Sequence, residues 1–175
     1  MFSVYLRRFT QVKKANIMIA RDSDGYSIKV EGRATFECSP PLKNFSKNIS
    51  SELIKNIFID LSECTWMDST FMGTLAIIGL KAKISNVHIE IVNSGKKNLD
   101  LLEELGIATL FIFNNSSESN KNEWDSLSGD SSDIAQTVLN AHEALIEIDE
   151  SNTPKFSKVV ELIKEDIAKK AEKKN

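Results

Sequence analysis

Short apolar runs alternate with amphipathic stretches along the first two thirds of the chain. Helical spacing of apolar residues predicts three helices, over 42–53, from Ser69 onward and over 98–106. Alternating strands and helices indicate an α/β layer in which helices cover a sheet. The apolar runs that predict the strands lie at 17–20, 26–30, 56–61, 87–92 and 110–113.

Two of these runs carry additional information. Asp24-Gly25 separates the first two runs and is a common hairpin turn signal, so we expect them to pair. The run at 56–61 is nearly continuous, which is typical of a central strand buried on both faces. Gly106 is expected to end the third helix.

The pattern changes after Asn114. Of the 20 residues from Asn114 to Asp133, 11 are Ser or Asn, so the segment 115–132 is interpreted as a linker or mobile loop, with Trp124 as its candidate anchor. Beyond it, two amphipathic helices joined by a short turn are predicted within 133–172. Their apolar stripes need a partner, and three remain open: each other, the preceding domain or a second chain. The stripes are Ile134, Val138, Ala141, Leu145 and Ile148 in one helix, and Phe156, Val159, Val160, Ile163 and Ile167 in the other.

Composition narrows the class of protein. A chain of 175 residues with 41% hydrophobic content can form one domain with extra elements, and a net charge of −3 argues against a nucleic-acid binder. Two cysteines, Cys38 and Cys64, are expected to be reduced thiols in a cytoplasmic protein. No apolar run approaches the roughly 20 residues of a membrane span. The arm at 1–16 is expected to be a frayed terminus, or the chain begins at Met18.

The informative motif is Asp68-Ser69-Thr70, where a strand and short loop end and a helix begins. Free amides and the helix dipole favour negative charge at that point. A phosphate on Ser69 would be tolerated and would add about −1.5 to −2 charge beside Asp68. That charge would repel an acidic or apolar partner surface. From local chemistry alone, a plain helix cap formed by Asp68 and Ser69 is the simpler interpretation.

The stretch from Asp60-Leu61 through the loop at 64–67 to Asp68-Ser69-Thr70, followed by Gly73 and Leu75, resembles the STAS family. This family includes the anti-sigma factor antagonists. The resemblance implies a STAS-like α/β domain over 17–114, with a mixed sheet of four to five strands covered by helices. The helical pair at 133–172 would be a C-terminal two-helix extension.

The resemblance also implies a function, namely that of a non-enzymatic bacterial regulator acting by partner switching. In such systems the unphosphorylated antagonist binds an anti-sigma factor that is also a serine kinase. The kinase phosphorylates the Ser of the Asp-Ser pair, and a PPM-type phosphatase reverses the modification. Carried over, Ser69 is the phospho-acceptor and Thr70 a second candidate acceptor, and the partner-binding residues are Asp68, Ser69, Thr70, Phe71 and Met72.

The sequence departs from the family pattern at one position, and two other functions remain open. Antagonists often have Gly where this chain has Phe71, which is expected to alter how closely a partner approaches. The chain is alternatively a scaffold that forms homo-oligomers through its C-terminal helices without any switch. A third reading is a nucleotide- or small-anion-binding module that uses the helix N-terminus at Ser69.

Other chemistry finds little support. His88 and His142 are isolated, and the zinc motif that His142-Glu143 would begin lacks its second histidine, so no metal is expected. His88 is expected on a solvent-facing strand position, and His142 at the surface or in hairpin packing. No catalytic triad or Cys–His arrangement is recognisable, so neither an enzyme nor a cofactor is predicted.

Overall fold

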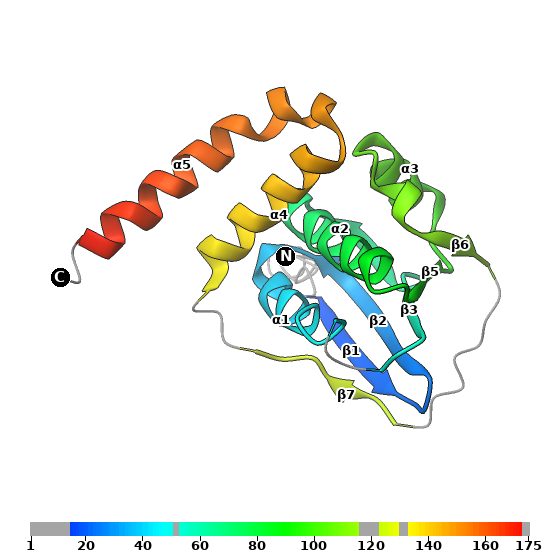
Figure 1. Cartoon of the computed structure of the whole chain (residues 1–175). Coiled ribbons are helices and arrows are strands. Elements are labelled where there is room, and N and C mark those ends of the chain that lie inside the picture. Colours follow the sequence, from blue (N-terminus) through cyan, green and yellow to red (C-terminus); the bar gives the residue numbers. More distant parts are fainter. Residues whose placement is uncertain (1–14, 51–52, 116–122, 130–132, 173–175) are drawn as a thin grey trace, which may run out of the picture.

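The computed structural model describes residues 15–50, 53–115, 123–129 and 133–172 (Figure 1). Its strands are β1 (Asn16–Arg21), β2 (Gly25–Ala34), β3 (Asn56–Asp60), β4 (Cys64–Met67), β5 (His88–Val92), β6 (Ile112–Asn114) and β7 (Asp125–Ser126). Its α-helices are α1 (Ser39–Phe45), α2 (Ser69–Ile84), α3 (Lys96–Glu104), α4 (Ile134–Ile148) and α5 (Thr153–Glu172). Short 3₁₀ turns are η1 (Phe36–Cys38), η2 (Ile107–Leu110) and η4 (Glu150–Asn152).

The strands form one mixed sheet in the order β6-β5-β3-β2-β1-β7, with β4 paired to β2. β1 runs antiparallel to β2 across the predicted Asp24-Gly25 hairpin, and β2, β3, β5 and β6 are mutually parallel neighbours. The expected count of four to five strands is too low, because the described part of the sheet has seven. The loop at 64–67 forms β4, and the Ser/Asn-rich segment contributes the two-residue β7, which pairs with β1.

Helices cover one face of this sheet. In β3, Ile57 and Ile59 are fully buried, whereas Phe58 between them and Asp60 after them are only half-buried. The prediction that this strand is buried on both faces is therefore wrong. Burial alternates along the strand, although its sequence is almost continuously apolar. The buried side joins one core cluster with residues of the first three helices, Leu42, Leu75 and Leu102.

Two predicted elements are shorter than expected. The helix expected over 42–53 stops at Phe45, where the Ser46 hydroxyl donates to the Lys43 carbonyl at 2.7 Å and competes with the helical backbone bonds. Leu53 is consequently exposed, although it matched the helical spacing. The strand expected over 110–113 is shorter, because Leu110 belongs to η2. Gly106, with φ of +72°, lies just after α3, which confirms the predicted stop.

The C-terminal helices differ in how they meet the domain. α4 packs against α2 so closely that a Cβ on Gly73 would lie 2.4 Å from the Ala141 carbonyl oxygen. α2 is thus enclosed between the sheet and α4, and 10 of its residues are buried. α5 turns back beside α4, where Lys164 pairs with Glu143 at 2.7 Å, but none of its residues is fully buried (Figure 1). In the preceding segment, Leu127 packs on the core and Trp124 is half-buried. The arm at 1–16 lies outside the described residues, apart from Ala15 and Asn16.

Candidate functional site

Asp68 builds the junction at which β4 ends and α2 begins. One carboxylate oxygen accepts the Phe71 N–H at 2.8 Å and caps α2, and the other accepts the Phe36 N–H at 2.8 Å. The backbone N–H of Asp68 donates to the Ala34 carbonyl at 3.0 Å. Asp68 therefore fixes the start of α2 and of η1 relative to the end of β2. The helix-cap interpretation of Asp68 is confirmed.

Ser69 is the first residue of α2 and is half-buried. Its Oγ lies 3.0 Å from Nε2 of His142, a residue of α4 that is 73 positions away in the sequence. The other ring nitrogen, Nδ1, lies 2.8 Å from the Val138 carbonyl oxygen one turn earlier in α4. The C-terminal extension thus reaches directly onto the predicted phospho-acceptor.

The three residues after Ser69 point away from solvent. Thr70, Phe71 and Met72 are 5%, 0% and 5% exposed, and the Thr70 carbonyl accepts a hydrogen bond from the Thr74 hydroxyl at 2.9 Å. The Phe71 ring fills the core, so its bulk does not stand on the surface beside Ser69. Among the residues predicted to bind a partner, Asp68 and Ser69 are the ones with appreciable exposed area.

His142 completes the site and is the residue that sequence reasoning missed. It is 4% exposed, and its ring packs against Phe156 of α5 with centroids 4.9 Å apart. Burial lowers the pKa of His142, while the hydrogen bond to Val138 and the negative charge of Asp68 oppose this change. The imidazole is therefore neutral at pH 7. The signal in the sequence was a polar residue between Val138 and Leu145 on an apolar helical stripe.

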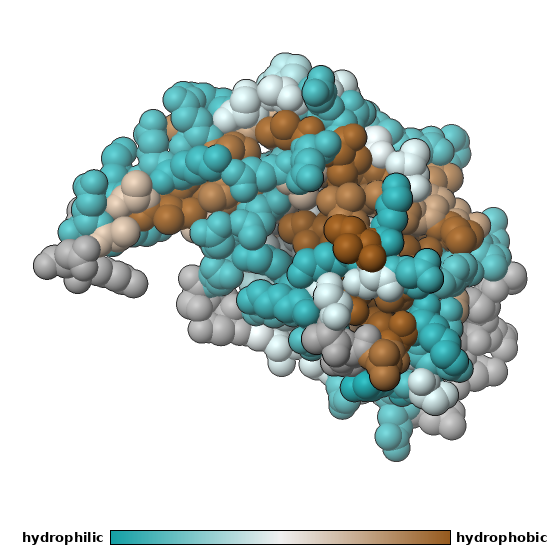
Figure 2. Space-filling model, in the orientation of Figure 1, coloured by the Kyte–Doolittle hydropathy of each residue, from teal (hydrophilic) through white to brown (hydrophobic). Residues whose placement is uncertain are grey.

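An open apolar groove of about 500 Å³ lies next to this junction. α4 and α5 form its long walls, and Thr70 and the 42% exposed ring of Phe36 stand at the α2 end. Figure 2 shows apolar surface continuing along α5. The remaining lining residues are Ile134, Ala135, Val138, Ile163 and Lys170.

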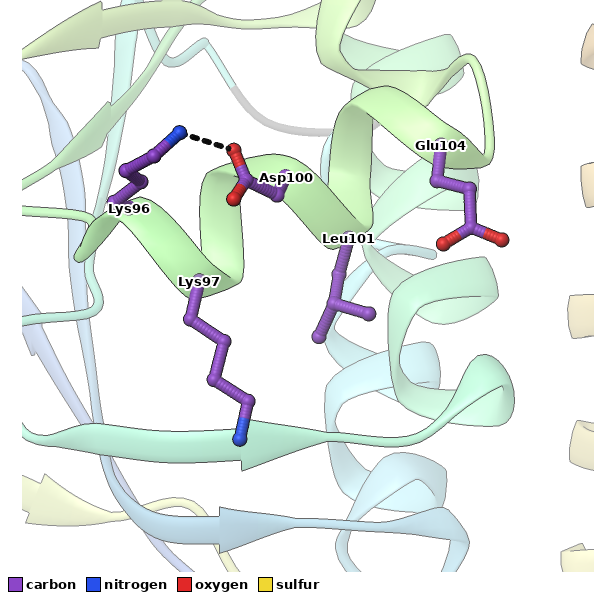
Figure 3. Close-up of a pocket in the computed structure, with 5 residues that line it drawn as sticks. All are labelled: Lys96, Lys97, Asp100, Leu101 and Glu104. Atoms are coloured by element: carbon purple, nitrogen blue, oxygen red, sulfur yellow. Dashed lines mark hydrogen bonds and ion pairs between the residues drawn. The ribbon is translucent and has the colours of Figure 1, made fainter.

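A second hollow, of about 450 Å³, lies on α3 (Figure 3). Lys97 and Leu101 extend on the same side of the helix, whereas Lys96 turns to Asp100 and pairs with it at 3.1 Å. The charged side chains do not converge on one point, unlike those of a built ligand site. The hollow is therefore not a built anion site, and it lies on α3, whereas the anion-binding alternative uses the N-terminus of α2 at Ser69.

The described ranges contain neither a cluster of metal-ligating side chains nor a reactive thiol. Within them, no three His, Cys, Asp or Glu side chains gather as a metal site would require, and none of their helices is long and apolar enough to cross a bilayer. Burial raises the pKa of Cys38 to about 11 and also raises that of Cys64, so both buried thiols are protonated at neutral pH. His88 is exposed on β5, as predicted.

No family model matches the sequence, and no curated protein matches it either. The structure, by contrast, is similar to solved structures, among them that of the anti-sigma factor antagonist SpoIIAA in its unphosphorylated form. The two superpose with a TM-score of 0.51 at 11% sequence identity, over 57% of this chain and 88% of the other. Likeness at this identity establishes the fold. The chain therefore has the STAS-like α/β fold that its motif implied, with helices added at the C-terminus.

Proposed function

We propose that the chain is an anti-sigma factor antagonist-like regulator that acts by partner switching, with Ser69 as the phosphorylated residue. The supporting observation is a half-buried serine at the first position of α2, in a fold shared with an antagonist described in its unphosphorylated form. The partners would be an anti-sigma factor with serine kinase activity and a PPM-type phosphatase, in the bacterial cytoplasm. Ser69 is the favoured acceptor, because Thr70 is 5% exposed.

The junction suits such a switch electrostatically. The first amides of α2 and its dipole stabilise an anion at Ser69, so a phosphate would not unfold the helix. The same phosphate adds about −1.5 to −2 charge next to the carboxylate of Asp68. A partner that docks on this junction in the unmodified state would meet a strongly negative surface after modification. The chain itself needs no catalytic activity for this response.

Phosphate mapping tests the proposal directly. Protein recovered from its native cells is digested with trypsin, and the peptide from Asn56 to Lys81 is sequenced by mass spectrometry. We expect phosphate on Ser69 and none on the other hydroxyl residues of that peptide. A Ser69→Ala chain provides the control and should lose the modified peptide. Phosphate absent from Ser69 under every growth condition would contradict the proposal.

Capture of partners tests the switch. Wild-type protein, Ser69→Asp and the neutral, similarly sized Ser69→Asn serve as baits in native lysate. We expect a serine kinase to bind the wild-type and Ser69→Asn chains and to be lost with Ser69→Asp, because only Asp carries the added charge. Identical captures by all three chains would overturn partner switching at this residue.

A second candidate function is an unswitched scaffold that assembles through α5. It is favoured by Leu162, which is 51% exposed on a helix without buried residues. Sedimentation velocity over a range of concentrations distinguishes the two functions. A scaffold would form oligomers that Leu162→Glu dissociates and Ser69→Asp leaves intact. A monomer at all concentrations would exclude it.

A further inference from the structure

The contact between Ser69 and His142 has a defined direction. A backbone carbonyl can only accept, so the 2.8 Å contact with Val138 places the proton of the neutral ring on Nδ1. Nε2 is then left with a lone pair. The Ser69 hydroxyl, 3.0 Å away, must be the donor to it. A serine hydroxyl that donates to an imidazole, itself oriented by a third group, is the arrangement that activates a serine oxygen in nucleophilic catalysis.

The surrounding helices fix this geometry. His142 is 4% exposed and lies between the α2–α4 contact at Gly73 and the ring of Phe156. Asn152 in η4 links the end of α4 to the residue that follows α3, because its side-chain amide donates to the Leu105 and Leu145 carbonyls at 3.0 and 2.9 Å. The imidazole is therefore held in a position that a surface histidine would not keep.

Burial keeps His142 in the neutral, basic form. It lowers the pKa of the ring and outweighs the negative charge of Asp68, the residue that caps α2, which acts in the opposite direction. On the other packed elements, Lys164 of α5 is tied to Glu143 at 2.7 Å. Lys43 of α1 is likewise tied to Asp133 at 3.1 Å. Two further elements contact α4: η1, which contains Glu37 and Cys38, and η4, which begins at Glu150 after its cap Asp149.

We propose that His142 accepts the hydroxyl proton of Ser69 during phosphoryl transfer and then, as an imidazolium, pairs with the phosphate formed there. This inference rests on the proposed function, since it concerns the same acceptor. In the step, Ser69 Oγ attacks the γ-phosphorus of a nucleoside triphosphate held by the partner kinase. The Oγ–P bond forms, the bond from phosphorus to the β–γ bridging oxygen breaks, the nucleoside diphosphate leaves, and the proton moves from Oγ to Nε2.

The product state requires the protonated ring. With His142 neutral, the Nε2 lone pair would face a phosphate dianion at hydrogen-bond distance, which is repulsive. With His142 protonated, Nε2–H donates to a phosphate oxygen in a charge-assisted hydrogen bond. The pair would hold the phosphate against α4 and remove part of its charge from the surface. His142 is thereby assigned a catalytic contact from α4, beyond the range 17–114 to which the sequence pattern assigned the STAS-like domain.

Phosphoserine encoded at position 69 tests the pairing without any kinase. Long-range ¹H–¹⁵N spectra of the imidazoles, recorded at a series of pH values, follow the protonation of His142. We expect its pKa to rise from below its ordinary value of 6.5 to above it. Phosphoserine at position 85, at the far end of α2, is the matched control and should leave it low. A His142 pKa that stays below 6.5 with phosphoserine 69, or that rises equally with phosphoserine 85, would overturn the proposal.

The proton-acceptor role has its own readout. Once the kinase is in hand, His142→Gln should slow modification of Ser69 at least about tenfold, because general bases contribute factors of 10² or more. Circular dichroism confirms that the variant is folded. An unchanged rate would overturn this role. Should Ser69 carry no phosphate in cells, the proposed function fails, whereas the spectra of the encoded phosphoserine still decide whether His142 pairs with it.

Discussion

The two C-terminal helices follow one another in sequence and carry similar apolar stripes, yet they are used differently. α4 buries Leu139, Ala141 and Leu145 against the domain and supplies His142 to the site. α5 has no buried residue, although Phe156 at its start touches His142. Helical spacing alone therefore shows that a helix has an apolar side, and it does not show what that side covers.

The difference changes how the extension is understood. A separate hairpin would bury its stripes against each other and leave α2 with an exposed side. Here α2 is apolar around most of its circumference because α4 covers the side that faces away from the sheet. α4 is thus a layer of the domain, and α5 is the appended element. The experiments below test this assignment, from the largest expected effect to the smallest.

The same truncation in the two helices should separate them most clearly. Leu145 is 0% exposed in the core cluster, so Leu145→Ala should lower the free energy of unfolding by about 2–5 kcal/mol. Leu162 is 51% exposed, and Leu162→Ala should change it by less than about 0.5 kcal/mol. Urea denaturation followed by fluorescence measures both. Equal losses would mean that α5 is buried in solution or that α4 folds apart from the domain.

The spacing between α2 and α4 is the next point to test. In Gly73→Ala the new methyl group would meet the Ala141 carbonyl at 2.4 Å, and two helix backbones have to separate to admit it. We expect a loss of about 1–3 kcal/mol, together with a weaker Ser69–His142 contact seen as a changed imidazole resonance. Gly95→Ala is the control, because nothing lies within 4 Å of its Cβ. A stable Gly73→Ala variant with unchanged His142 signals would refute the close packing.

Local patterns were sufficient for five of the seven described strands and for the start of the site. Alternation at Tyr26, Ile28 and Val30 identified β2, and the Asp68-Ser69 pair marked the beginning of α2. These features depend on neighbours within a few positions, which a single sequence displays. The helix over 42–53 was predicted too long because apolar spacing does not show where side chains such as that of Ser46 compete for backbone carbonyls.

The missing part of the site depends on distant contacts. Ser69 and His142 are 73 positions apart, and nothing near either residue indicates the other. Gly73 entered as part of a family pattern, and the structure supplies its physical reason, the approach of Ala141. The sequence suggested that Phe71 would alter the approach of a partner. Its side chain instead points into the core, a direction that packing decides and that the local sequence does not show. Only the arrangement of α4 over α2 resolves these questions.

The smallest expected effect is a pH dependence carried by α4 alone. Burial lowers the pKa of His142 in the folded chain, whereas the unfolded imidazole titrates near 6.5. Between the two values the unfolded state binds more protons, so the free energy of unfolding rises with pH there. The contribution of His142 is fully present above pH 6.5 and is lost as the pH falls through its folded pKa.

Urea denaturation at several pH values between about 7.5 and 5 measures this dependence. His142→Gln should flatten that part of the profile, and His88→Gln, which alters an exposed residue of β5, should retain it. α5 contributes exposed pairs such as Lys158–Glu161 at 2.8 Å, whose side chains are 71% and 58% exposed. A profile equally steep in His142→Gln would place the titrating group elsewhere than in α4 and would contradict this last distinction between the two helices.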